Sequence, residues 1–175
     1  MRRLFALSIC LVIATLGFAQ KAIDGHAAKL STGQIAKLHK LKQPCYLPAY
    51  IPAGFVVTNF AADAKDEEGP SFDITYSKAH TKQSLTVQMA SGGIGDIFFD
   101  EENGAVEKPT ISQEVAIPGL GKCDFEAYDK GKNHQFHTQW IDLGEKHKMR
   151  FLAVIGFGIS GAEGIRIAKS LRLLK

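Results

Sequence analysis

The fold is decided by residues 71–90, SFDITYSKAHTKQSLTVQMA. Two runs in this stretch alternate apolar with polar side chains, and their apolar members are Phe72, Ile74 and Tyr76, then Leu85, Val87 and Met89. Successive side chains of a strand point to opposite faces of a sheet, so this alternation is typical of strands with one buried face. The stretch therefore predicts two half-buried strands of an antiparallel sheet.

Further strands are expected after this stretch and before it. Alternation recurs at residues 123–127 and along residues 134–140, where one face carries His134, Phe136, Thr138 and Trp140. Residues 55–62, 111–117 and 150–155 are further strand candidates, which bring the expected total to about seven strands. Turn signals containing glycine separate them, for example Asn103-Gly104 and Pro118-Gly119. Short connections between so many strands indicate one antiparallel sheet.

A helix is expected on each side of the strands. Apolar residues within 26–41 have helical spacing, and this helix would start near Ser31 or Thr32. Ser160 and Glu163 have the spacing of a capping box. They precede an apolar stripe made of Ile165, Ala168, Leu171 and Leu174. The fold class is therefore α+β, an antiparallel sheet with an N-terminal and a C-terminal helix packed on it.

The first nineteen residues predict a secretory signal. Arg2 and Arg3 precede an uncharged apolar run, and small residues at positions 17 and 19 suit a signal peptidase, so Gln20 would begin the mature chain. The run spans about 15 residues, which is short for a bilayer core of roughly 30 Å and disfavours the alternative of an uncleaved anchor. We divide the chain into a signal peptide (1–19), an N-terminal helical segment (20–44) and an antiparallel β domain with a C-terminal helix (45–175). The protein is expected to be secreted or periplasmic.

The charges of the mature chain are nearly balanced. Without Arg2 and Arg3 it keeps 19 of the 21 Lys and Arg residues, against 18 Asp and Glu. A nucleic acid partner is not expected, because neutralising phosphates requires a concentrated basic face. No second apolar run is long enough to span a membrane, so no transmembrane segment is expected in the mature chain.

Two cysteines remain after the signal, Cys45 and Cys123. In an oxidising compartment an even number of cysteines favours a disulfide, so we expect this pair to be bonded. The alternative is two separate buried thiols.

Two glycine-rich stretches invite a phosphate-binding interpretation. Residues 156–161, GFGISG, match G-x-G-x-x-G, but too little chain follows for the second parallel strand that a dinucleotide site needs. These glycines are interpreted as a sharp turn from a strand into a helix. Residues 91–96, SGGIGD, lack the lysine of a phosphate loop. This stretch is either a flexible connection or a mobile apolar lip at the mouth of a cavity, formed by Ile94, Ile97, Phe98 and Phe99.

No catalytic or metal-binding constellation is found in the sequence. His134 and His137 are separated by an odd number, so on one strand they point to opposite faces and cannot share an ion. Neither H-E-x-x-H nor G-x-S-x-G occurs. We therefore expect a protein that is not an enzyme, with no cofactor and no metal.

The chain resembles a group of uncharacterised bacterial extracytoplasmic domains. The resemblance lies in Leu47-Pro48-x-Tyr50-Ile51-Pro52-x-Gly54-Phe55, Tyr76, Ser160-x-x-Glu163 and Ile167-Ala168-x-Ser170-Leu171. These domains are similar to the lipoprotein-carrier fold and to periplasmic regulators of envelope-stress sigma-factor signalling (the LolA/RseB-like fold). The resemblance implies a curved antiparallel half-barrel with helices across its concave side. It also implies a hydrophobic cavity for a lipid-like or peptide ligand, and it supplies no catalytic residues.

The leading functional hypothesis is an exported, non-enzymatic binding module for an apolar or lipid-like ligand or an envelope protein. The apolar faces of residues 72–76 and 85–89 would point toward the C-terminal helix and leave a groove lined by Tyr76 and gated by residues 91–99. The alternative is that these side chains form a closed core. Two other functions stay open, a structural or interaction protein of the envelope without a cavity, and a hydrolase whose distant residues no motif reveals.

Overall fold

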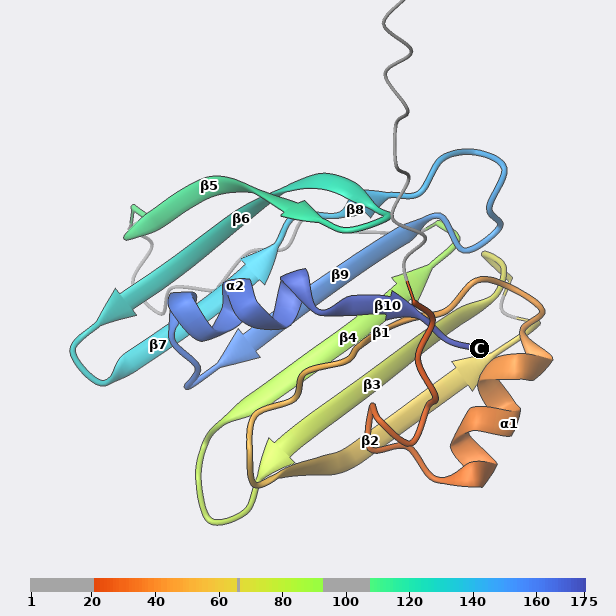
Figure 1. Cartoon of the computed structure of the whole chain (residues 1–175), viewed down its shortest axis with the longest axis horizontal. Coiled ribbons are helices and arrows are strands. Elements are labelled where there is room, and N and C mark those ends of the chain that lie inside the picture. Colours follow the sequence, from red (N-terminus) through yellow and green to blue (C-terminus); the bar gives the residue numbers. More distant parts are fainter. Residues whose placement is uncertain (1–20, 66, 93–107) are drawn as a thin grey trace, which may run out of the picture.

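A computed structural model describes residues 21–65, 67–92 and 108–175. The described part contains an eight-stranded antiparallel sheet and two helices, so the α+β expectation is confirmed (Figure 1). The sheet is open, with the order β2-β3-β4-β9-β7-β6-β5 and the short β8 beside β9. Its strands are β2 (Phe55–Asp63), β3 (Ser71–Lys78), β4 (Ser84–Ala90), β5 (Ile111–Ile117), β6 (Gly121–Lys130), β7 (Asn133–Thr138), β8 (Ile141–Asp142) and β9 (Phe151–Phe157).

Strands β3 and β4 form the hairpin that the alternation predicts. Ile74 pairs with Val87 and Tyr76 with Leu85, so the apolar side chains of both strands share one face. That face is buried, while the alternating polar residues are half-buried on the other face of the sheet. The two faces are called here the covered face and the open face.

A second layer lies across the covered face, in front of the sheet in Figure 1. It consists of the N-terminal segment, α1 (Thr32–Lys40), β1 (Tyr46–Pro48), α2 (Gly161–Lys169) and β10 (Leu171–Leu173). Helix α1 begins after Ser31, whose hydroxyl accepts from the Gln34 amide while the Gln34 side chain accepts from the Ser31 amide. This reciprocal capping fixes the start of the helix where the sequence places it.

The two ends of the second layer are joined by backbone hydrogen bonds. Strands β1 and β10 pair antiparallel, with Pro48 opposite Leu171. Ile23 forms a parallel bridge to Leu174, and the Lys175 amide donates to the Ile23 carbonyl. Four residues within 28–41 also belong to the same buried cluster as the sheet, namely Ala28, Leu30, Leu38 and Leu41. The described residues 21–44 are therefore part of one packed unit with the sheet.

The C-terminal helix is shorter than expected. It ends at Lys169, and the residues expected to extend its stripe, Leu171 and Leu174, lie in or beside β10. The Leu174 amide donates to the Cys45 carbonyl, a strand-type contact that a continued helix would lose. Leucines three apart favour a helix, and the pairing of β10 with β1 overrides that local pattern.

Helix α2 covers a different part of the sheet from the one expected. It packs on β5, β6 and β7. The apolar side of β3 and β4 is covered instead by the N-terminal segment and by β1 with β10, since the Tyr76 hydroxyl donates to the Ala28 carbonyl and the Tyr46 amide to the Met89 sulfur. The expected contact between this apolar side and the C-terminal helix is therefore wrong.

Candidate functional site

The residues expected to bind a ligand fall into two groups. Ile94, Ile97, Phe98 and Phe99 lie outside the described residues. Tyr76 is described, and none of its surface is exposed. Its hydroxyl donates to the Ala28 carbonyl at 3.0 Å, and burial raises the pKa of this phenol. Tyr76 is therefore a hydrogen-bonded member of the core.

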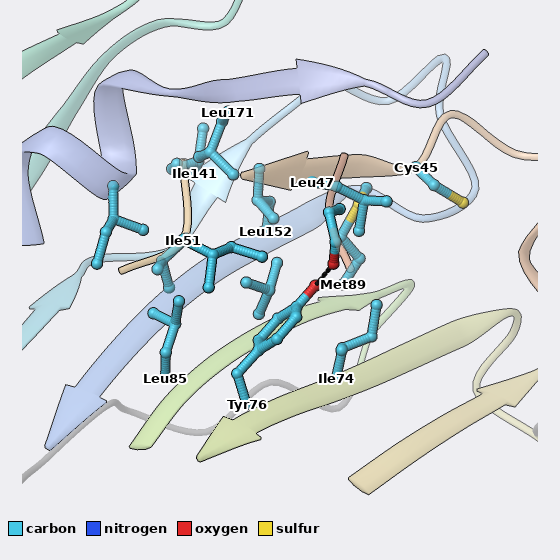
Figure 2. Packing of buried hydrophobic residues seen from close by; sticks show 14 of the residues in the cluster. Cys45, Leu47, Ile51, Ile74, Tyr76, Leu85, Met89, Ile141, Leu152 and Leu171 are labelled. Carbon is cyan, nitrogen blue, oxygen red and sulfur yellow. Dashed lines mark hydrogen bonds between the residues drawn. The ribbon is translucent and has the colours of Figure 1, made fainter. Parts of the chain in front are cut away.

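The place expected to hold an apolar groove is filled by the protein itself. The apolar side chains of β3 and β4 are between 0% and 3% exposed. Leu47, Ile51 and Leu171 from the second layer are also buried, and Figure 2 shows them in the same cluster as Tyr76. Fully enclosed side chains leave no surface for a ligand to contact. The alternative of a closed core describes this region.

The expected Cys45–Cys123 disulfide is not formed, and both side chains are buried free thiols. Cys45 lies beside β1, where its sulfur is 3.5 Å from the Gln43 carbonyl oxygen. The next residue, Tyr46, contacts Met89 on β4, whereas Cys123 lies on β6. Strands β9 and β7 separate β4 from β6 in the sheet. Neighbouring strands are about 4.8 Å apart, so the cysteines exceed the roughly 7 Å Cα separation that a disulfide tolerates.

The glycines of G-x-G-x-x-G serve close packing and a turn. A Cβ on Gly156 would lie 2.1 Å from the Phe136 ring, and one on Gly161 would lie 2.6 Å from the Ala127 Cβ. Gly158 has a φ of +67°, a left-handed conformation that glycine adopts without strain. The motif thus lets β9 turn sharply and brings α2 against the sheet.

The N-terminus of α2 is already occupied by a carboxylate. Asp129 on β6 accepts from the Gly161 amide at 3.0 and 3.2 Å, and its other close partner is His134 Nδ1 at 2.9 Å. A helix N-terminus attracts anions because its first amides are unpaired and its dipole is positive there. Asp129 satisfies that attraction from a distant strand, so no local sequence signal could reveal it.

His134 and His137 lie on opposite faces of β7, as expected. His134 is on the covered side with Asp129, while His137 is 2% exposed and on the open side. There His137 Nε2 is 3.5 Å from Glu126, whose carboxylate also accepts from the Tyr128 hydroxyl. Burial lowers the pKa of His137, and the Glu126 charge offsets part of that effect. Within the described ranges no three His, Cys, Asp or Glu side chains are grouped as metal ligands.

A surface cluster that the sequence did not predict joins the proline-rich segment to α2. The Tyr50 hydroxyl donates to the Glu163 carboxylate and accepts from Arg166 at 3.1 Å. The Arg166 guanidinium also lies 3.7 Å from the centre of the Tyr50 ring. Glu163 therefore contacts Tyr50, and only the Ser160 half of the expected capping box forms, with the Glu163 amide donating to the Ser160 hydroxyl.

The candidate binding surface is the edge strand β2. In the described part of the chain β2 pairs only with β3, so its other edge offers unpaired backbone groups. Residues 55–62 carry no charge, and Val56 is 55% exposed beside the exposed Thr58, Asn59 and Ala61. A bulge between Val57 and Asn59 interrupts the regular pairing. We call the exposed residues 56, 58, 59 and 61 the β2 edge.

The opposite edge of the sheet is chemically different. Strand β5 has an exposed Glu114, which pairs with Lys122 at 2.8 Å. Its packing against α2 covers part of the strand. Charged side chains discourage an additional strand from pairing, and residues 55–62 of β2 carry none, although helix α1 packs beside this strand.

Comparison with known proteins finds no relative of this chain. No family model matches it, and no curated protein or solved structure matches it. Within residues 21–65, 67–92 and 108–175 no helix has the length and apolar character that crossing a membrane requires.

Proposed function

We propose that this protein is an exported, non-enzymatic interaction module of the cell envelope that binds an extended segment of another protein at the β2 edge. The observation that carries the proposal is the combination of a filled core under β3 and β4 with an uncharged, unpaired edge on β2. A partner would then bind at the surface of the protein and not inside its core.

The chemistry of the β2 edge suits strand addition. An extended peptide beside an edge strand gains main-chain hydrogen bonds, and alternate side chains supply specificity. The first part of β2 is less accessible to an added strand. It contains the bulge, and the Lys29 ammonium donates to the Phe55 carbonyl at 2.9 Å. Asn59 to Ala62 are left as the segment that an incoming strand would pair with.

Export is supported by the predicted signal. Ile23, close after the expected cleavage site, forms a bridge to Leu174. An exported module with this edge meets its partner among envelope or secreted proteins.

An apolar or lipid-like ligand is the second candidate function, and it would bind on the open face. Val56, Ser77, Ser84 and Phe157 pair in one row across β2, β3, β4 and β9. Val56 is 55% and Phe157 42% exposed, and two small serines lie between them. Among the described residues, this row offers such a ligand an exposed apolar surface.

Photo-cross-linking at the β2 edge tests the first candidate. A photoreactive amino acid at Asn59 in the producing cell is expected to give discrete protein adducts. Ala61→Lys should abolish them, because a lysine on an edge strand discourages a further strand from pairing. The matched control is Ser112→Lys on β5, since both substitutions place a lysine opposite an acidic residue, Asp73 or Glu126. No adducts, or equal loss with both variants, would reject the proposal.

A further inference from the structure

The balanced charge of the chain conceals a strong asymmetry between its two layers. The second layer, residues 21–54 and 159–175, contains 9 Lys and Arg but only 2 Asp and Glu. The sheet with its connections, residues 55–158, contains 10 Lys and Arg against 16 Asp and Glu. We call the second layer the basic layer.

The basic layer forms one broad face of the molecule. Helix α1 packs beside β2 at one edge of the sheet, and α2 packs on β5, β6 and β7 at the other. The N-terminal segment and the β1–β10 pair lie between them, as Figure 1 shows. Charges on these elements therefore act together on the same side.

The basic side chains of this layer are exposed and lack acidic partners. Lys37, Lys40, Lys42, Arg166, Lys169 and Lys175 are all exposed. Where hydrogen bonds are formed they go to neutral groups, as with Lys29 to the Pro52 and Phe55 carbonyls. The ion pairs between described residues all lie within residues 55–158. The positive charge of the layer is thus left for an external partner.

We propose that the basic layer docks onto the anionic headgroup surface of a membrane. Seven of its nine basic residues are lysines, compact charges that suit a diffuse negative surface better than a planar, bidentate target. They are spread from edge to edge over a layer of packed elements, as a flat lipid surface requires. Leu173, 37% exposed on β10, adds an apolar contact.

The first described residue also lies on this layer. Lys21 is exposed, and Ile23 is fixed there by its pairing with Leu174. The basic charge of the layer therefore extends to the N-terminal end of the described chain.

Vesicle co-sedimentation of residues 20–175 tests the proposal. Binding is expected to vesicles containing phosphatidylglycerol and not to pure phosphatidylcholine. It should disappear at about 1 M salt, where the screening length is about 3 Å. Each lysine near an anionic membrane contributes about fivefold in affinity, so removing three should weaken binding on the order of a hundredfold.

Two triple variants have the same change in net charge. They distinguish binding through the basic layer from binding that depends only on the total charge. The first variant carries Lys40→Gln, Lys169→Gln and Lys175→Gln in the basic layer. The second carries Lys65→Gln, Lys82→Gln and Lys146→Gln, which replace exposed lysines within residues 55–158. Only the first triple should lose the binding. Equal loss in both, no preference for phosphatidylglycerol, or binding of duplex DNA as tight as that of vesicles would overturn the proposal. Ala61→Lys, which tests the β2 edge, should leave vesicle binding unreduced.

Discussion

Burial controls the chemistry of the two cysteines. Desolvation raises the pKa of the Cys45 thiol to about 12 and that of Cys123 to about 11, so little thiolate exists near neutral pH. The native mature chain is therefore expected to react very slowly with Ellman's reagent. Two thiols per chain should react once it is unfolded without reductant. A denatured chain with no reactive thiol would mean that the two cysteines are bonded.

Two glycines at helical positions should respond oppositely to the same substitution. A Cβ on Gly164 in α2 would lie 2.5 Å from the Phe136 ring, whereas nothing lies within 4 Å of a Cβ on Gly33 in α1. Gly164→Ala is expected to lower the free energy of unfolding by about 1–3 kcal/mol through overpacking. Gly33→Ala should raise it by up to about 1 kcal/mol, since alanine favours the helix. Urea unfolding measures both, and equal effects would contradict the close packing of α2.

At the scale of elements, the C-terminal residues should behave as a strand over the core. Leu171 is fully buried and Leu173 is 37% exposed, although both belong to β10. Leu171→Ala is expected to cost about 2–5 kcal/mol of unfolding free energy, as buried leucines do, and Leu173→Ala under about 1 kcal/mol. Thermal or urea unfolding of the two variants checks this. Similar losses at both positions would contradict the decrease in burial from Leu171 to Leu173 along β10.

The elements of the sheet could be predicted because alternation is a local signal. Residues 71–90 became β3 and β4, and the expected strand around residues 123–127 became β6. The three-residue strands β1 and β10 could not be found, since each is too short for a period and each exists by pairing with the other. The stripe through Leu171 and Leu174 suggested a longer helix, but residues 171–173 pair with β1 instead.

Long-range placement was the part that sequence could not supply. Asp129 on β6 caps helix α2, and Tyr50 of the proline-rich segment contacts Glu163 and Arg166 of the same helix. In each case the partners are far apart in the sequence. The disulfide was inferred from the expected compartment, which carries no information about the distance between Cys45 and Cys123. The groove was inferred from apolar side chains whose covering could not be known.

At the scale of the whole molecule, the two layers differ in charge and in the partner that we propose for each. The basic layer seals the apolar side of the sheet and presents its lysines outward, while the acidic sheet leaves the β2 edge unpaired. The two proposed surfaces therefore lie on different elements. Binding at one is not expected to block the other.

The central claim is that the second layer fills the apolar face of the sheet with the protein's own side chains. Native mass spectrometry of the mature protein, isolated from the producing cells without organic solvent, tests this most directly. The account predicts the mass of the chain alone, unchanged by extraction with organic solvent. A stoichiometric extra mass that extraction removes, and that Tyr76→Ala abolishes in a still folded chain, would contradict it.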